Sequence, residues 1–320
     1  MDNITNITPM IKSKSYIMEE MRELIDCGIP DGLRTDVKKL DDIIRLKLGT
    51  FVVMTGYAGM GKSEFIDWLC YKYNVKYGYK TLYYSPENTT QLHLPKLTSK
   101  FTGKSYNDLS IEVRDNVLEY ITDNFYFFDE RQENYIEDII SEAERFIKEH
   151  DIKIVVFEPF NSFITKMTNG NLFELNTIRI ILTRLRSLAI NNNVLVILTA
   201  HPKKPTDNYL YATNDIAHSL DFKNRADYSL SIHRKKNKEV EINVDKVRDK
   251  TFGKVGKCTL SYDMASGNYY ESDEYNDVEY VHEPFKIPIL PQSKDILDVD
   301  VGNSNEKEER LIQQNYNRIA

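Results

Sequence analysis

One glycine-rich stretch of the chain has the residue types and the spacing that bind phosphate. It follows the P-loop pattern Gly-x-x-x-x-Gly-Lys-Ser and consists of Gly56, Tyr57, Ala58, Gly59, Met60, Gly61, Lys62 and Ser63. Glycines let the backbone N–H groups curl around an anion at the positive end of a helix dipole. We expect Lys62 to reach the β- and γ-phosphates of a nucleotide, and the Ser63 hydroxyl to ligate Mg²⁺.

The residues on either side of this stretch supply the context that the pattern requires. Residues 51–55 form an apolar run typical of a buried strand, and residues 64–77 form an amphipathic run that predicts a helix. A bare pattern match could be a glycine-rich turn that fits by chance, but a strand before it and a helix after it are the context that the pattern demands. The sequence therefore predicts a nucleotide phosphate site, and we include Glu64, at the start of the predicted helix, among its residues.

Two glutamates that follow predicted strands are candidates for the chemistry at the phosphates. Glu158 follows the nearly continuous apolar run 152–157, and a carboxylate there can hold the Mg²⁺ shell or simply cap the next segment. Glu87 follows the strand predicted at 80–85. It could orient or deprotonate an attacking water, as hydrolysis requires, or it could be an exposed acid in a turn.

Basic residues after another predicted strand could contact phosphate or nucleic acid. His201 follows the strand predicted at 194–199, where it could sense the γ-phosphate through a hydrogen bond or cap the edge of the sheet. Lys203 and Lys204 begin a loop that also contains two tyrosines. Cations beside aromatic rings are the groups that grip single-stranded nucleic acid, although a lysine pair in a loop is more often merely solvated.

A second pair of cations closes the strand predicted at 240–247. Alternation along that strand puts Lys246 and Arg248 on one face, toward the same neighbour. One interpretation is an arginine finger that reaches a nucleotide held by an adjacent subunit. The other is a pair of solvated cations that protects an edge strand against aggregation.

The elements that must position these residues alternate along the first part of the chain. Apolar runs predict strands at 51–55, 80–85, 125–128, 152–157 and 194–199. Helical periodicity predicts helices at 14–27, 37–46, 64–77, 91–101, 111–121, 135–149 and 172–191. After Asp227 the pattern changes to hairpin-like strands at 228–233, 240–247 and 257–263, with a turn at 265–268. We predict an α/β fold whose mainly parallel sheet is flanked by helices and extended by antiparallel strands.

Composition limits the class of protein. A hydrophobic fraction of 41% in 320 residues excludes wholesale disorder, and a net charge of −7 argues against adhesion to nucleic acid or membrane over the whole surface. The cysteines Cys27, Cys70 and Cys258 are far apart, so we expect a reducing compartment rather than a zinc site or disulfides. Because we find no apolar run of membrane-spanning length and no signal-peptide core, we expect a cytoplasmic protein, in the host cytoplasm if a phage encodes it.

The order of the motifs resembles that of the hexameric replicative helicases of the DnaB/Twinkle type. The resemblance covers residues 28–272 and rests on the P-loop and on five later segments: 84–88, 156–159, 199–204, 215–234 and 246–256. Residues 215–234 and 246–256, followed by Tyr262, Asp263 and Gly267, are similar to the Twinkle-like and bacteriophage branch.

This resemblance implies a RecA-like P-loop NTPase core that assembles as a ring, expected to be a hexamer, and moves along single-stranded DNA at a replication fork. It would hydrolyse ATP or a dNTP with Mg²⁺. By motif position the resemblance assigns the following roles: Lys62 and Ser63 to the Walker-A pair, Glu87 to the catalytic glutamate, His201 to the sensor, Arg248 to the arginine finger with Lys246 as its partner, Lys203, Lys204 and Lys166 to DNA-binding loops, and Arg234 and Tyr262 to the nucleotide base.

The chain departs from the family pattern in two ways. The usual Walker-B acid is Asp, whereas here it is Glu158, which is one methylene longer and would shift the Mg²⁺ geometry. We also expect only a linker with an amphipathic helix at 1–27, followed by the RecA-like domain at 28–283 and a flexible tail at 284–320. Loading and priming would then need a separate loader or primase.

Two other classes of protein fit the same residues. One is a RecA- or clock-type ATPase that binds DNA or protein without unwinding a duplex. The other is a nucleotide-binding assembly module with negligible turnover, for which the substitution at Glu158 leaves room.

Overall fold

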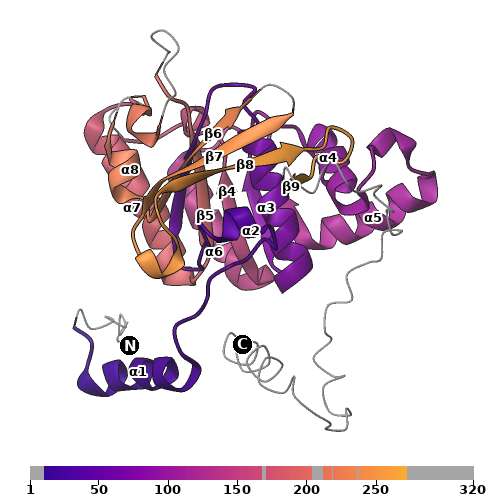
Figure 1. Ribbon diagram of the computed structural model, residues 1–320. Helices are drawn as coiled ribbons and strands as arrows, with labels where there is room; N and C mark the ends of the chain where they lie inside the picture. Colours follow the sequence, from indigo (N-terminus) through magenta and orange to yellow (C-terminus); the bar gives the residue numbers. More distant parts are fainter. Residues whose placement is uncertain (1–10, 168–170, 204–211, 218, 236–237, 272–320) are drawn as a thin grey trace, which may run out of the picture. The chain divides into compact units, whose positions relative to one another are not determined.

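A computed structural model describes residues 11–167, 171–203, 212–217, 219–235 and 238–271 (Figure 1). The chain divides into two units, and each is considered by itself. The larger unit begins at Gly32 and contains the sheet. The predicted tail at 284–320 lies outside the described residues.

In the described residues, nine strands form a single sheet in the order β3-β2-β4-β5-β1-β6-β7-β8-β9. The strands are β1 (Phe51–Thr55), β2 (Lys80–Tyr84), β3 (Phe125–Phe127), β4 (Ile152–Phe157), β5 (Leu195–Ala200), β6 (Tyr228–Arg234), β7 (Glu239–Val247), β8 (Gly256–Tyr262) and β9 (Tyr269–Glu271). Pairing is parallel from β3 to β6 and antiparallel from β6 to β9. The predicted mainly parallel sheet with an antiparallel extension is therefore confirmed.

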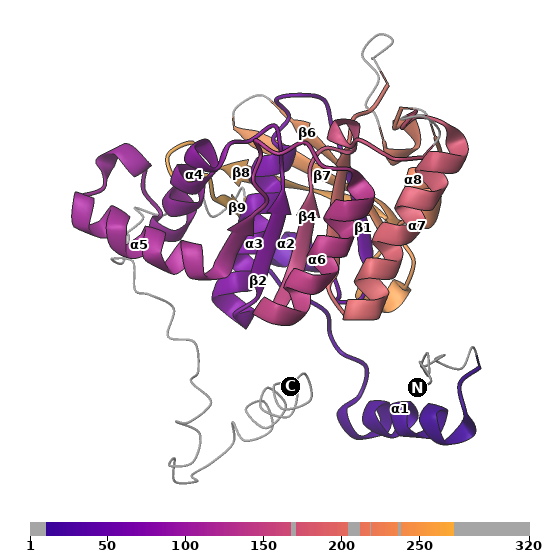
Figure 2. The ribbon, with the colours of Figure 1, turned by 180° about the vertical axis from the view of Figure 1, so that it is seen from behind.

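Helices cover both faces of this sheet (Figure 2). One face packs against α3 (Lys62–Tyr77), α4 (Thr90–Thr102) and α5 (Ile111–Asn124). The other packs against α6 (Ile136–His150), α7 (Leu175–Asn192) and α8 (Asp221–Arg225). Shorter elements are α2 (Lys38–Asp41), η1 (Tyr106–Asp108), η2 (Phe160–Ser162), η4 (Thr213–Asp215) and η5 (Lys250–Phe252).

Strand β4 illustrates why the central strands are apolar throughout. Ile154 and Val156 belong to the core on the α3 side, and Val155 and Phe157 belong to the core on the α6 and α7 side. Side chains alternate between the two faces of a strand, so helices on both faces require apolar residues at every position. Each such side chain contributes about 1.5–3 kcal/mol on burial.

One predicted helix is wrong. Helical spacing predicted a helix at 37–46, but only Lys38–Asp41 is helical. Ile44 instead forms a β-bridge with Gly253, and Leu46 forms one with Leu33. These bridges bury the apolar residues of the segment in the core. The prediction failed because the period of a short apolar run does not distinguish a helix from extended chain. Helix α8 and strand β9 were not predicted.

Helix α1 (Lys14–Cys27) has the predicted bounds. The Ser13 hydroxyl accepts a hydrogen bond from the Tyr16 N–H at 3.2 Å and caps its start. Several large apolar side chains of this helix are exposed, including Ile17, Met21 and Leu24. Among the described residues, no helix is both long and apolar enough to cross a membrane.

Candidate active site

The P-loop connects the end of β1 to the start of α3. Gly56 is needed for close approach, because a Cβ there would lie 3.1 Å from the Ile232 carbonyl oxygen and 3.1 Å from the Lys62 Cγ. Gly59 and Gly61 have φ angles of 78° and 90°, which disfavour other residues. The glycines of the motif therefore serve the local geometry that the sequence predicted.

Lys62 lies over this loop, and only 7% of it is exposed. Its ammonium group donates to the Gly56 carbonyl at 2.8 Å and to the Tyr57 carbonyl at 3.3 Å. Burial lowers the pKa of Lys62, and the carboxylates of Glu158 and Glu87 oppose that shift. The ammonium thus lies within the field of both predicted acids.

Ser63 and Glu158 meet directly, although strand β5 separates their strands in the sheet. The Ser63 hydroxyl donates to Glu158 Oε1, and the Glu158 N–H donates to the Tyr84 carbonyl at 2.9 Å. Glu158 is 5% exposed, and burial is the main reason that its pKa rises to about 7. Among the described residues, its buried Oε2 has no hydrogen-bond partner.

This pair of oxygen ligands fits a Mg²⁺ ion. A serine hydroxyl and a carboxylate are hard oxygen donors, which Mg²⁺ prefers. A buried carboxylate oxygen without a partner is costly to retain unless a ligand satisfies it. Ser63 and Glu158 therefore have the chemistry to hold this ion, and their role as metal ligands stays a prediction.

A buried ion pair that the sequence argument missed lies next to these ligands. Asp67 Oδ1 is 2.8 Å from His93 Nε2, and both side chains are at most 3% exposed. Burial lowers the pKa of His93, but Asp67 outweighs it, so the pKa is raised. Asp67 also contributes to the raised pKa of Glu158. Asp67 lies four residues after Ser63, so the two side chains share one face of the helix. This spacing is a signal in the sequence that could have revealed Asp67.

Glu87 and His201 lie at the same edge of the sheet. Glu87 follows β2 and is exposed, and His201 follows β5. Burial and the Lys62 ammonium lower the pKa of His201, while Glu87 acts in the opposite direction. A hydrogen bond also links His201 to the Gly56 backbone. The structure thus brings the predicted lysine, sensor histidine and two glutamates together at the carboxyl ends of parallel strands, where ligands of open α/β sheets bind.

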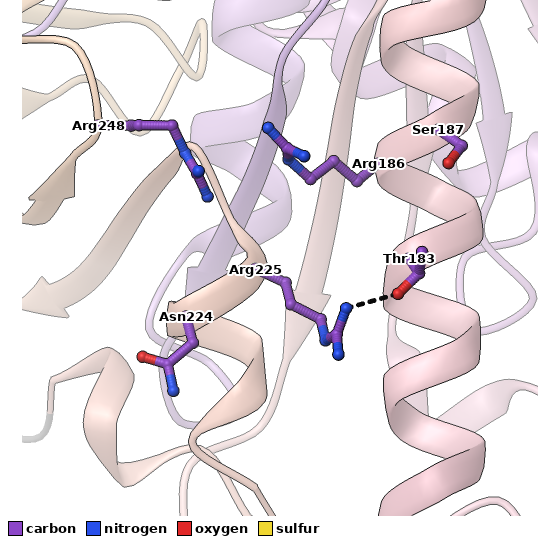
Figure 3. Close-up of a pocket in the computed structure, with 6 residues that line it drawn as sticks. All are labelled: Thr183, Arg186, Ser187, Asn224, Arg225 and Arg248. Carbon is purple, nitrogen blue, oxygen red and sulfur yellow. Dashed lines mark hydrogen bonds between the residues drawn. The ribbon is translucent and has the colours of Figure 1, made fainter. Parts of the chain in front are cut away.

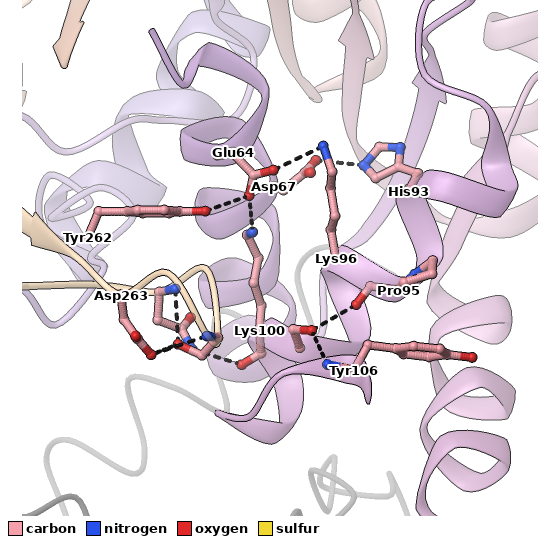
Figure 4. A network of polar contacts seen from close by, with 12 residues as sticks. Glu64, Asp67, His93, Pro95, Lys96, Lys100, Tyr106, Tyr262 and Asp263 are labelled. Atoms are coloured by element: carbon pink, nitrogen blue, oxygen red, sulfur yellow. Dashed lines mark hydrogen bonds and ion pairs between the residues drawn. The ribbon is translucent and has the colours of Figure 1, made fainter. Parts of the chain in front are cut away.

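Glu64 takes part in a polar network beside the loop (Figure 4). Its carboxylate pairs with the Lys100 ammonium at 2.6 Å and with the Lys96 ammonium at 3.1 Å. Burial raises the pKa of Glu64, but the two lysines outweigh it and lower the pKa to about 2. The carboxylate of this predicted nucleotide-binding residue is therefore engaged with α4.

Tyr262 and Arg234, the two residues predicted to hold the nucleotide base, lie in different surroundings. The Tyr262 hydroxyl donates to Glu64 Oε2 at 3.3 Å, and its ring centroid is 5.0 Å from that of Tyr269. Tyr269 in turn lies beside the loop, since its hydroxyl would be 3.6 Å from a Cβ at Gly61. Arg234 is exposed at the end of β6, with Nη2 3.9 Å from the Met264 sulfur. Tyr262 is thus near the P-loop helix, and Tyr269 is a neighbour that sequence reasoning missed.

Lys246 and Arg248 are not brought to their own P-loop. Val247 pairs with Tyr228, which pairs with Val52 near the start of β1. Arg248 therefore lies at the amino ends of the parallel strands, roughly 15 Å from the loop at ~3.3 Å per residue. Its Nε is 2.7 Å from Asp227 Oδ1. The Lys246 ammonium donates to the carbonyls of Lys223 and Asn224 at 2.7 and 2.8 Å.

The predicted DNA-binding lysines are described in part. The Lys203 N–H donates to the Asp215 carbonyl at 2.7 Å, so the segments on either side of residues 204–211 run side by side. Lys204 lies outside the described residues. The Lys166 ammonium is 2.6 Å from Asp138 Oδ1 and 5.3 Å from the centre of the Tyr135 ring.

Comparison with known proteins gives a consistent result. Residues 32–271 match the family model of the DnaB-like helicase C terminal domain. The Twinkle homolog protein, chloroplastic/mitochondrial, of Arabidopsis thaliana is 28% identical over 260 residues, which is 75% of this chain. The chain spans only 36% of that relative's length.

Two solved structures share the fold. One, an ATPase domain, superposes with a TM-score of 0.68 at 17% identity, and the match covers 82% of this chain and 99% of that chain. The other, a DnaB-like replicative helicase solved in a study of its interactions with primase, gives a TM-score of 0.65 at 17% identity and covers 82% of this chain and 67% of its own. The RecA-like fold predicted from the sequence is thereby confirmed.

Proposed function

The chain belongs to the DnaB-like helicase C-terminal domain family, and from this premise we propose that it is an ATP-hydrolysing motor that moves along single-stranded DNA and unwinds duplex DNA. The proposal rests on one observation: the groups expected to act in hydrolysis lie at two opposite ends of the sheet strands. Lys62, Glu87 and Glu158 gather at one end of the strands, whereas Arg248 lies at the other. A second copy of the chain would have to complete the site, as in a ring.

Each group in the site has a chemical task. Lys62 binds the β- and γ-phosphates, and His201 contacts the γ-phosphate. Ser63 and Glu158 would hold a Mg²⁺ ion, which when bound neutralises part of the phosphate charge. Glu87 takes the proton of the attacking water as its oxygen bonds to the γ-phosphorus and the bond to the β–γ bridging oxygen breaks.

The remaining roles are proposals on the same premise. Arg248 of one copy, with Lys246, contacts the nucleotide of the next, and helix α1 in the segment 1–27 packs on a neighbouring copy of the domain 28–283. Lys203, Lys204 and Lys166 contact the DNA strand, and a hexamer would surround it. A separate primase or loader would act with the ring. The three separated cysteines suit a cytoplasmic location.

A forked-duplex unwinding assay with ATP and Mg²⁺, run beside size measurement with and without nucleotide, tests this function. We expect strand displacement and nucleotide-dependent assembly, with both the turnover and the displacement absent in Lys62→Ala. Hydrolysis stimulated by DNA without displacement would point instead to a RecA- or clock-type ATPase. Triphosphate binding with negligible turnover would point to an assembly module.

A further inference from the structure

A cavity of about 240 Å³ opens between α7, α8 and the end of β7 (Figure 3). It is lined by Thr183, Arg186, Ser187, Asn224, Arg225 and Arg248. The guanidinium groups of Arg186 and Arg248 extend from separate elements toward each other, and that of Arg225 extends toward Thr183 on α7. Three of these six lining residues are arginines, and none of the six is acidic.

Asp227 lies beside the cavity and holds two of these arginines. Its Oδ1 is 2.7 Å from Arg248 Nε and 3.2 Å from Arg186 Nη2. Its Oδ2 accepts the Phe51 N–H at 3.0 Å, which ties the pair to the start of β1. One buried carboxylate thus sets the position of both guanidinium groups relative to the central strand.

Neighbouring carboxylates balance the positive charge of the cavity only in part, because Asp227 is shared by two arginines and Asp221 also pairs with Arg179. Arg225 donates to the Thr183 hydroxyl at 2.6 Å, but its buried Nε has no hydrogen-bond partner among the described residues, and Asp221 Oδ1 is 3.8 Å away. Burial lowers the pKa of Lys246 close by, and Arg248 and Arg186 add to this shift. Cations crowded in this way favour an anionic ligand, and arginine forks match phosphate oxygens.

We infer that this cavity receives the terminal phosphate of the nucleoside triphosphate bound by a second copy of the chain, and that Arg186 supplies a second guanidinium beside Arg248 while Asp227 positions both. The inference rests on the proposed function, because it requires a neighbouring P-loop. The chain's own P-loop is excluded, since the cavity lies at the opposite ends of the strands. The phosphates of single-stranded DNA are the competing occupant.

Steady-state hydrolysis by the full-length chain gives the first test. Removal of one such preorganised donor typically costs about 10²–10³-fold in turnover. We expect Arg186→Gln to lower kcat by about 10²-fold, both with and without DNA, while single-strand affinity and triphosphate binding by the P-loop change little. Arg186→Lys should recover part of kcat. The matched control is Arg184→Gln, a change of equal charge at an exposed residue of α7 outside the cavity lining.

A loss of single-strand affinity in Arg186→Gln with kcat retained would assign the cavity to DNA and overturn the inference. Retained triphosphate binding shows that the variant is folded. If Arg186→Gln does not bind triphosphate, Arg186→Lys replaces it in both tests.

Mixing subunits that carry different substitutions then tests whether Arg186 acts on the site of a neighbouring copy or within its own chain. Lys62→Ala keeps the cavity but lacks the loop lysine, and Arg186→Gln keeps the loop but lacks the arginine. In a mixed assembly, the loop of an Arg186→Gln copy can face the intact cavity of a Lys62→Ala copy. We expect the mixture to hydrolyse ATP well above either variant alone, whereas a merely structural Arg186 would leave it inactive and overturn the inference.

A mixture of Lys62→Ala with Arg248→Gln separates the role of Arg186 from the proposed function. If it regains hydrolysis and the Arg186→Gln mixture does not, the inference about Arg186 is wrong and the proposed function stands. If neither mixture regains hydrolysis, no site is shared between copies, and the proposed function and this inference fail together.

Discussion

The length of the Glu158 side chain matters, because Glu158 is the acid proposed to hold Mg²⁺. Strand β5 lies between β4, which ends before Glu158, and β1, which leads to Ser63. The glutamate spans this gap and accepts the Ser63 hydroxyl. The family's usual aspartate would be shorter by about 1.5 Å. We therefore expect an aspartate at this position to fall short of Ser63.

Glu158→Asp tests this expectation. The shorter side chain should lose the contact with Ser63, and a hydrogen bond to a charged group is worth ~1.5–3 kcal/mol. The Mg²⁺ concentration that half-saturates ATP hydrolysis should rise about tenfold, since 1.36 kcal/mol corresponds to a factor of ten. Glu174→Asp, before α7, is the control. An unchanged Mg²⁺ requirement would argue that Glu158 does not hold the ion.

Among the elements, helix α4 is joined to helix α3, which follows the P-loop, by three ion pairs. His93 pairs with Asp67, and Lys96 and Lys100 pair with Glu64. Helix α4 begins at Thr90, shortly after the predicted catalytic Glu87. These pairs therefore hold the segment that carries Glu87 in place relative to the P-loop.

The Glu64 cluster should make stability depend on acid pH. The folded-state pKa of about 2 is below the ordinary value of 4.5. A lowered carboxyl pKa stabilises the fold above pH 4.5, and this stabilisation is lost as the pH falls toward 2. Glu64→Gln should lower the free energy of unfolding by at most about 3 kcal/mol at pH 7.

Urea denaturation between pH 7 and pH 3 measures this difference. The gap between the wild-type chain and Glu64→Gln should narrow below pH 4.5. Glu112→Gln, at an exposed acid in the first turn of α5, should leave the pH dependence of the free energy of unfolding unchanged. A gap that stays constant over this range would mean that the lysines do not stabilise the Glu64 carboxylate.

In the molecule as a whole, the groups proposed to act in hydrolysis do not all lie together. The P-loop and its acids lie at one end of the parallel strands and the arginines at the other. Helix α1 also presents Ile17, Met21 and Leu24, which are exposed by 44%, 44% and 41% at helical spacing. Both features suit a chain that acts with copies of itself.

Replacing Ile17 and Leu24 by Glu together should weaken assembly, because the buried apolar surface of the contact would be lost. Sedimentation with nucleotide should show assembly only at concentrations at least about tenfold higher, since a loss of ~1.4 kcal/mol suffices for that factor. Arg22→Glu, on the opposite side of α1, should assemble normally. Full assembly of the double variant would remove α1 from the proposed contact.

Much of the fold could be predicted from local pattern. The strand at 152–157 and the helix at 14–27 have the predicted bounds, because buried strands and amphipathic helices have distinct periods. The helix expected at 37–46 is wrong, because its apolar residues are buried through β-bridges to distant segments. Local period cannot report such contacts.

Local pattern is enough to predict the P-loop and the position of Glu87 and Glu158 after strands, because spacing and period fix backbone geometry over short distances. Only the tertiary structure brought Asp67 to His93, and Arg186 to Arg248 through Asp227. It also separated Arg248 from its own loop. These relations depend on strand order, which long-range packing decides and which no short stretch of sequence contains.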